Sequence, residues 1–223
     1  MIDDLKTVNP ENRMTPTHII LGNARDSHLP DKLADLAFTS PPYLNNYDYA
    51  DRARLETYFS GYASTWGDIT DKVRSRLIMS ATTQVNRNVF KVSDIISPQL
   101  KACEPCLAGA IQESVTELSQ RRLVKGGRKS YDILVGQYFN DMAAVLADTY
   151  RLLKPKGKFV LILGDSAPYG VHIPTENWLG RIGCGLGFST FTVQQLRTRG
   201  DKWRGNTQRH HVALQESLLT LYK

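Results

Sequence analysis

The residues with the clearest chemical potential stand in a row, Thr39-Ser40-Pro41-Pro42-Tyr43, directly after an apolar run at 36–38. The run predicts a buried strand, and the two prolines end it because proline cannot continue a sheet ladder. Such a strand end lies at the edge where open α/β sheets bind ligands. Because proline has no N–H, nearby carbonyl groups remain free to accept hydrogen bonds from an amino group, and the tyrosine offers a face for stacking a flat base. Taken alone, these residues also fit a proline-stiffened turn.

This pentapeptide, with residues 35–38 before it, resembles the catalytic motif of DNA amino-methyltransferases, the bacterial modification methylases that act on N4 of cytosine or N6 of adenine. The resemblance continues through residues 45–56 and 152–166, and it covers most of 17–67 and 130–223. Serine at position 40 is typical of the cytosine-N4 enzymes. The resemblance therefore favours cytosine N4 over adenine N6.

The resemblance implies S-adenosylmethionine as cofactor and direct transfer of its methyl group, without a covalent enzyme intermediate. It assigns the catalytic roles to Ser40, Pro41, Pro42 and Tyr43. Ser40 and the Pro41 carbonyl would orient the target amine, and Tyr43 would stack on a base flipped out of DNA. Positioning of this kind can supply about 7–11 kcal/mol of a reaction barrier.

On the cofactor side, the resemblance implies contacts from Asn23, Ala24, Thr39 and Ser40. Asn23 stands where the family usually has an acidic residue near the cofactor adenine, although a turn role explains it equally well. No stretch of the 223 residues matches the glycine-rich strand, loop and helix with which the family binds the methionine end of the cofactor. We therefore expect a partial or split methyltransferase: either a second polypeptide supplies that loop, which we favour, or this chain is a fragment or a divergent form.

A basic stretch near the C-terminus, with Trp203 inside it, predicts phosphate contacts, which position a protein on DNA. The predicted nucleic-acid-binding residues are Tyr43, Tyr47, Arg197, Arg199, Lys202, Arg204 and Arg209. A solvated surface loop is the alternative. The net charge of +6 permits a polyanionic partner without requiring one.

The elements that must position these residues alternate between strand and helix. Apolar runs predict buried strands at 18–21, 36–38 and 159–163, and closing strands at 190–196 and 212–221. Apolar residues repeating at three and four predict helices at 48–59, 134–152 and 174–187, and residues 31–33 could form a brief helical link. We expect an α/β fold, with a Rossmann-like, S-adenosylmethionine-dependent methyltransferase sheet of parallel character. The catalytic domain would be formed by residues 17–67 and 130–223. Residues 1–16 would form an N-terminal arm, and residues 68–129 a helical insertion.

Composition narrows the remaining possibilities. Three cysteines argue against a disulfide framework, and Cys103 and Cys106 lack the further ligands that zinc needs, so we expect no metal. The sequence shows no secretory signal and no apolar stretch near the ~20 residues that span a bilayer, so we expect a prokaryotic cytoplasmic protein that does not bind membranes. Two other functions stay open: an RNA amino-methyltransferase, and a non-catalytic DNA-binding or regulatory subunit of a modification system.

Overall fold

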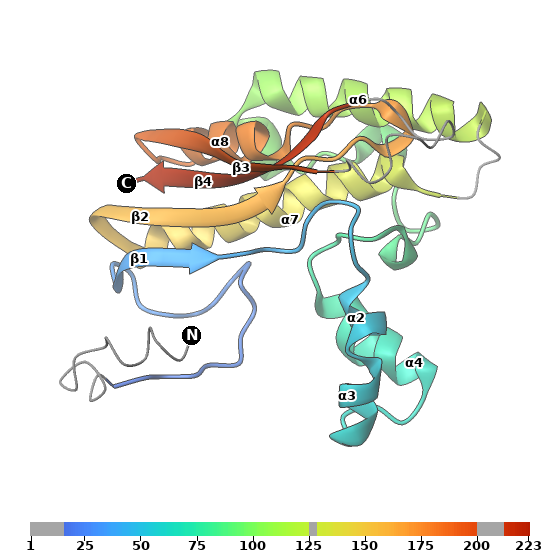
Figure 1. Ribbon diagram of the computed structural model, residues 1–223, viewed down its shortest axis with the longest axis horizontal. Coiled ribbons are helices and arrows are strands. Elements are labelled where there is room, and N and C mark those ends of the chain that lie inside the picture. Colours follow the sequence, from blue (N-terminus) through green and yellow to red (C-terminus); the bar gives the residue numbers. More distant parts are fainter. Residues whose placement is uncertain (1–15, 125–128, 200–211) are drawn as a thin grey trace.

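The computed structural model describes residues 16–124, 129–199 and 212–223, and its centre is a four-stranded open sheet (Figure 1). The strands are β1 (Ala34–Thr39), β2 (Leu153–Gly164), β3 (Thr190–Arg199) and β4 (Leu214–Tyr222). Their order across the sheet is β1-β2-β4-β3. β1 runs parallel to β2, whereas β4 is antiparallel to both β2 and β3. The sheet is therefore mixed, and the expected parallel character holds for one pair of strands.

The parallel pair brings two distant parts of the sequence to one edge. Thr39 pairs with Leu161, so the residues that follow β1 lie beside the last residues of β2. Gly164, at the end of β2, pairs with Glu216 of β4. Residues after β1, at the end of β2 and at the start of β4 therefore meet at the carboxyl edge of the parallel strands.

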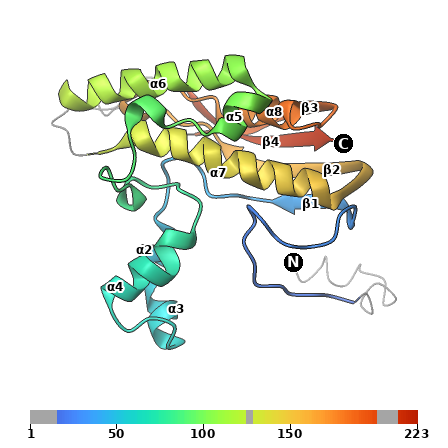
Figure 2. The ribbon, with the colours of Figure 1, turned by 180° about the vertical axis from the view of Figure 1, so that it is seen from behind.

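The helices that pack against the sheet lie on one side of it, as the view from behind shows (Figure 2). They are α5 (Pro98–Cys103), α6 (Pro105–Val124), α7 (Tyr131–Leu152) and α8 (Thr175–Gly185). α7 confirms the helix predicted from the spacing of its apolar residues, and its buried side chains form one core with β2 and β4. Leu107, Ile111, Val115 and Leu118 of α6 belong to the same core, so this part of the 68–129 segment packs on the sheet domain.

Burial along the strands shows which face of the sheet the helices cover. Phe159, Leu161 and Leu163 of β2 are buried in the core, whereas the alternate residues Val160 and Ile162 are only half-buried. Because successive side chains of a strand point to opposite faces, the helices cover one face. The strand predicted at 159–163 is present, but the prediction that it is fully buried is wrong. Among the described residues, helices cover only one side of β2.

A helical arm projects from the sheet domain (Figures 1 and 2). It contains α2 (Tyr49–Arg52), α3 (Arg54–Phe59), α4 (Trp66–Asp68) and a π-helical turn at Ile69–Val73, and it packs around a small core of Ala50, Ala63 and Ile69. Further 3-10 turns lie at Arg74–Arg76, Thr82–Gln84, Val92–Asp94 and Pro168–Gly170. The single helix predicted at 48–59 is interrupted at Ala53, which caps both α2 and α3.

Three local predictions are wrong. Residues 18–21 form no strand, and Ile19, Ile20 and Leu21 are exposed rather than buried. Residues 31–33 form no helix; there the backbone N–H groups of Lys32 and Leu33 donate to the end of α7. β1 forms where a strand was expected but is not buried, since two of its apolar side chains face outward.

The described residues hold no helix long and apolar enough to cross a bilayer. Within the same ranges, no cluster of three or more His, Cys, Asp or Glu side chains could hold a metal ion. The three cysteines are free thiols.

Candidate functional site

The segment after β1 is fixed at both of its ends. The Ser40 hydroxyl donates a hydrogen bond to the carbonyl oxygen of Ile162 in β2, across 3.2 Å. At the other end, Leu44 is buried in the main core and anchors the chain after the prolines. Pro41 is also buried, while Ser40 itself is exposed. These contacts hold Ser40 at the surface of the carboxyl edge, where the predicted end of the strand at 36–38 would place it.

The Tyr43 side chain reaches the start of β4. Its hydroxyl donates to Oε1 of Glu216 at 3.2 Å. The other carboxylate oxygen of Glu216 accepts from Nε of Arg197 in β3 at 2.6 Å. Burial raises the pKa of Tyr43 above 10.0, and the negative charge of Glu216 raises it further. The phenol therefore keeps its proton, as its role as hydrogen-bond donor requires.

Arg199 covers one face of the Tyr43 ring. Its guanidinium carbon lies 5.3 Å from the ring centroid, and Nη1 donates to the carbonyl oxygen of Asp165 at 3.0 Å. Gly164 makes room for this arrangement, because a Cβ built there would lie 2.1 Å from that same nitrogen. A glycine at the end of β2 therefore allows the arginine to bridge β2 and the tyrosine.

A cluster of buried polar groups lies behind this edge. Asp165 is almost completely buried, with Oδ1 accepting from the Gln215 N–H at 2.8 Å and Oδ2 sharing a hydrogen bond with Nε2 of His172 at 2.9 Å. The Gln215 side-chain amide donates to Oε1 of Glu176 at 2.7 Å, and Oε2 of Glu176 has no partner among the described residues. An isolated bridge between Ser166 and Ile173 closes the intervening turn. The 3-10 turn Pro168–Gly170 lies between the bridged residues, so the chain turns back after β2. From the sequence, Asp165 and Ser166 fit either a pocket wall or a tight turn, and the pocket-wall role stays a prediction.

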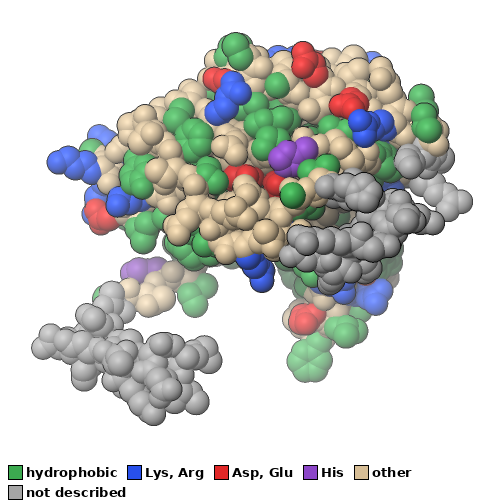
Figure 3. All heavy atoms as spheres, turned by 45° about the horizontal axis from the view of Figure 1, so that its top comes forward, with side chains coloured by type: hydrophobic (Ala, Val, Ile, Leu, Met, Phe, Trp, Pro, Cys, Tyr) green, Lys and Arg blue, Asp and Glu red, His purple; other side chains and the backbone are tan. Residues whose placement is uncertain are grey.

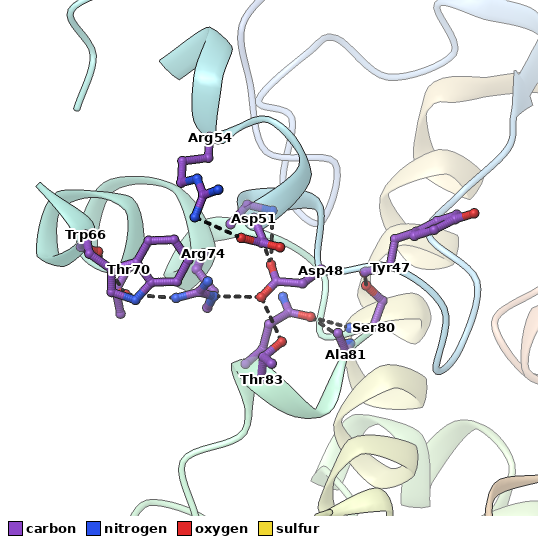
Figure 4. Close-up of polar contacts among 12 residues, drawn as sticks. Tyr47, Asp48, Asp51, Arg54, Trp66, Thr70, Arg74, Ser80, Ala81 and Thr83 are labelled. Atoms are coloured by element: carbon purple, nitrogen blue, oxygen red, sulfur yellow. Dashed lines mark hydrogen bonds and ion pairs between the residues drawn. The ribbon is translucent and has the colours of Figure 1, made fainter. Parts of the chain in front are cut away.

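Asp48 organises the base of the helical arm close to the motif (Figure 4). Its carboxylate caps α2 and accepts from Nε of Arg74 at 3.1 Å and from the Thr83 hydroxyl at 2.7 Å. Burial alone would raise the pKa of Asp48, but the hydrogen bonds from Thr83, the α2 backbone and Arg74 outweigh it and lower the pKa below 3.8. The neighbouring Tyr47 ring points away from this cluster and is stacked by Arg52 instead.

The structure does not bring all predicted residues into contact. Asn23 and Ala24 lie in a turn in which the Asn23 side-chain oxygen Oδ1 accepts from Arg25, and no hydrogen bond among the described residues joins that turn to Thr39 or Ser40. Their cofactor role stays a prediction. Lys202, Arg204 and Arg209 lie outside the described residues.

The two described arginines of the basic stretch both have partners within the chain. Arg197 pairs with Glu216 and Arg199 with the Asp165 carbonyl. On the face of the molecule in Figure 3, lysine and arginine side chains are scattered among other types rather than gathered in one patch. The DNA contacts predicted for these arginines therefore stay predictions.

Sequence reasoning missed Glu216, which pairs with Arg197 and accepts from the Tyr43 hydroxyl. Its signal is an acidic residue near the start of a strand that is mostly apolar after residue 217, and the acidic side chain is buried. Buried carboxylates need partners, so a charge at such a position indicates a polar site nearby.

No protein-family model matches the chain. Two curated relatives are type II methyltransferases named M.AvaI, from Nostoc sp. and Anabaena variabilis, each 27% identical over 167 residues that make up 74% of this chain and 33% of the relative. A third is the type II methyltransferase M.BsoBI of Geobacillus stearothermophilus, 24% identical over 204 residues, which cover 84% of this chain and 38% of that protein. The chain thus spans about a third of the length of the curated relatives it matches.

Among solved structures, a candidate DNA modification methylase from Thermus thermophilus covers 91% of this chain and 50% of its own, with 14% identity and a TM-score of 0.36. A TM-score of that size does not establish a common fold. The sequence relatives are more informative, and they are DNA methyltransferases of bacteria.

Proposed function

We propose that this chain, a relative of bacterial type II DNA methyltransferases, presents an exocyclic amine of a flipped DNA base for methylation, cytosine N4 ahead of adenine N6. The proposal treats its four strands as part of a Rossmann-like methyltransferase sheet. Within the chain, it assigns residues 1–16 to an N-terminal arm, residues 17–67 and 130–223 to a catalytic domain, and residues 68–129 to a helical insertion.

The observation that carries the proposal is the hydrogen bond of Ser40. Its single hydroxyl proton is donated to the Ile162 carbonyl, so Oγ can act toward an N–H group only as an acceptor. An exocyclic amine offers such N–H donors. With the Pro41 carbonyl as a second acceptor, the amine would be held by its protons, leaving its lone pair directed at the methyl donor.

Tyr43 would stack on the flipped base. Arg199 already lies over one face of the ring, so the base must take the opposite face or displace the guanidinium. Glu216 and Arg199 together restrict the ring to one orientation, which reduces the entropy lost when a base binds. We assign the phosphate contacts to the surface around Tyr47 and to five basic residues: Arg197, Arg199, Lys202, Arg204 and Arg209.

The residues present fit the amine side of the reaction and one wall of a cofactor site. Thr39 and Ser40 carry hydroxyls at the carboxyl edge, and Asn23 and Ala24 are the other proposed contacts. When bound, S-adenosylmethionine supplies an activated methyl group. The amine nitrogen would bond to this methyl group as the methyl–sulfur bond breaks, and one amine proton would pass to solvent, so no residue of the chain needs to form a covalent bond.

We further propose that a second polypeptide completes the cofactor site with the glycine-rich loop. This proposal rests on the 223 residues containing no match to that loop. A neighbouring reading frame that encodes an apolar strand followed by a glycine-rich loop is the expected source. Finding that loop in the same reading frame as this chain would contradict a split enzyme while leaving the amine site unchanged.

The test is transfer of a labelled methyl group from S-adenosylmethionine to DNA by this chain together with the loop-carrying polypeptide. We expect transfer by the pair, and its loss in both Ser40→Ala and Tyr43→Ala. Parallel incubations with RNA separate the two substrates. Binding to DNA without any transfer would overturn the catalytic proposal and indicate a regulatory subunit.

A further inference from the structure

Positive charge is concentrated where α6 ends. Residues 118–131 contain five lysine or arginine residues and no aspartate or glutamate. The structure describes three of these cations, Arg121, Arg122 and Lys129, which together form the basic helix end. The helix dipole favours cations in the last turn of a helix, but Lys129 lies beyond the end of α6. The dipole therefore does not account for the whole cluster.

The basic helix end is fixed against the turn that follows β2. Nη1 of Arg121 donates to the carbonyl oxygen of Tyr169 across 2.8 Å, and Tyr169 lies in the 3-10 turn Pro168–Gly170. The Tyr169 hydroxyl donates to the carbonyl oxygen of Lys129 at 3.5 Å. This turn comes shortly after β2 ends at the carboxyl edge. The last turns of α6 thus lie at the same edge of the sheet as Ser40 (Figure 1).

The turn has a backbone conformation that its surroundings must hold. Tyr169 has a φ of 49° and a ψ of 24°, in the left-handed region that residues other than glycine seldom adopt. Such a conformation persists only where neighbouring contacts determine it. Here the contacts come from the basic helix end and from Tyr131, whose ring meets the Tyr169 ring edge-on with the centroids 4.8 Å apart. The cations therefore keep a defined position relative to the candidate site.

Little negative charge among the described residues neutralises the basic helix end. Nη2 of Arg121 binds Oε1 of Glu117 at 2.5 Å, but both side chains are nearly half exposed, and an exposed ion pair contributes little to stability. Asp132, the next acidic residue along the chain, is buried and paired with Arg87. Nε of Arg122 is buried and has no hydrogen-bond partner among the described residues. The cluster therefore keeps a net positive charge, and Arg121 can exchange Glu117 for another anion.

We infer that the basic helix end binds backbone phosphates of the target DNA and positions the duplex at the candidate site. This inference rests on the proposed function and adds a contact surface on the helical insertion to those proposed above. Guanidinium and ammonium groups form strong, charge-assisted hydrogen bonds with phosphate oxygens, and a duplex brings a line of phosphates to the edge where a flipped base enters. Contacts of this kind hold a protein in register on DNA without reading its sequence.

The test measures the affinity for duplex DNA of the full chain, alone and with the loop-carrying polypeptide, over a range of salt concentrations. Each phosphate contact contributes about 0.9 to the steepness with which log affinity falls against log salt. We therefore expect Arg121→Gln and Lys129→Gln each to lower that slope by about 0.9, equally for DNA of any sequence. Unchanged slopes in both variants would overturn the inference and leave the cluster to an acidic partner other than DNA.

Two cations far from this edge serve as matched controls. Arg181→Gln changes an arginine of α8 that is as exposed as Arg121 and likewise pairs with a glutamate, Glu104. Glu104 lies just before α6 begins, and a helix of 20 residues is about 30 Å long, so this pair lies near the opposite end of α6. Lys101→Gln, on α5, is the control for Lys129. Neither control should change the slope, and a loss as large as that of Arg121→Gln would contradict a specific surface.

Two further variants separate the charge of Arg121 from its support of the turn. Arg121→Lys keeps the charge but loses the planar group that contacts both Tyr169 and Glu117, so it should retain the slope of the parent chain. The same loss in Arg121→Lys as in Arg121→Gln would mean that the arginine only supports the turn. Glu117→Gln removes a competing carboxylate and should strengthen binding by about twofold to fivefold at low salt, whereas weaker binding would contradict the inference. Circular dichroism confirms that each variant folds.

This inference and the proposed function fail in different ways. Unchanged slopes in Arg121→Gln and Lys129→Gln, with methyl transfer intact, would reject the phosphate contacts and keep the proposed reaction. Reduced slopes in a complex that transfers no methyl group would keep the contacts and reject the reaction. A parent chain that binds no DNA, alone or with the loop-carrying polypeptide, would overturn both.

Discussion

The Tyr43 hydroxyl donates to the Glu216 carboxylate across 3.2 Å and ties the loop after β1 to the start of β4. These residues are 173 positions apart in the chain, so the contact exists only when the sheet is formed. Arg197 binds the other oxygen of the same carboxylate. In the proposed reaction, Glu216 is a positioning residue that acts on the base through the orientation of Tyr43.

Glu216→Gln tests this positioning role. The amide can still accept from Tyr43 but loses its charge-assisted bond to Arg197, so we expect kcat for methyl transfer to fall by about threefold to tenfold while DNA affinity changes little. Tyr43→Phe keeps the ring and should give a similar loss, and the double variant should be no worse than either single one. Fully multiplicative losses in a double-mutant cycle would show that the two residues act independently.

Ser40→Ala removes the proposed acceptor of the target amine. The loss of a hydrogen bond that matters in the transition state should lower kcat by about tenfold to a hundredfold, with the dissociation constant for DNA unchanged. Ser40→Thr, which keeps a hydroxyl, serves as the matched variant and should retain more activity than alanine. Equal activity in Ser40→Ala and the parent chain would contradict the role of the hydroxyl.

Tyr43→Ala removes the stacking platform. Stacking of a base on an aromatic ring contributes about 1–3 kcal/mol, so we expect binding of DNA with an unpaired target base to weaken by about tenfold to a hundredfold. Fluorescence of 2-aminopurine at the target position reports base flipping directly. Unchanged fluorescence on binding, in parent and variant alike, would mean that no base leaves the duplex.

Asp48 predicts a pH dependence of the helical arm. Its folded-state pKa lies below the ordinary 3.8, so the stability it contributes is fully present above that value and is lost as the pH falls through the folded pKa. At neutral pH we expect Asp48→Asn to lower the free energy of unfolding by about 1–3 kcal/mol, because Arg74 loses its charged partner.

The measurement is chemical denaturation of the parent and Asp48→Asn at neutral pH and near pH 3. The difference between the two proteins should shrink at the lower pH. Asp71→Asn, an exposed carboxylate on the same arm, is the control and should change stability little at either pH. A difference that grows in acid would have the wrong sign for this account.

The long elements could be predicted because their apolar patterns are strong. The α7 helix follows from residues spaced by three and four, and β2 from five consecutive apolar residues at 159–163. Ser40 and Tyr43 could be placed at the carboxyl edge because Pro41 and Pro42 must end the strand before them. These features depend on local sequence alone.

The errors occur where structure depends on distant partners. An apolar run such as 18–21 indicates a strand but not whether a neighbouring strand is present, and here the described residues provide none. The mixed sheet could not be foreseen because strand direction is not encoded in periodicity. Glu216 and Arg199 meet Tyr43 only through the register of β4 and β3, so no local pattern predicts that these three residues come together.

The most direct test of the central claim is nucleoside analysis, by mass spectrometry, of DNA incubated with S-adenosylmethionine, this chain and the loop-carrying polypeptide. The account predicts N4-methylcytosine whose rate of formation falls by about tenfold to a hundredfold when Ser40→Ala replaces the parent chain. N6-methyladenine with the same dependence on Ser40 would change the target base and keep the site. Methylated DNA that does not depend on Ser40, or no methylated nucleoside at all, would contradict the account.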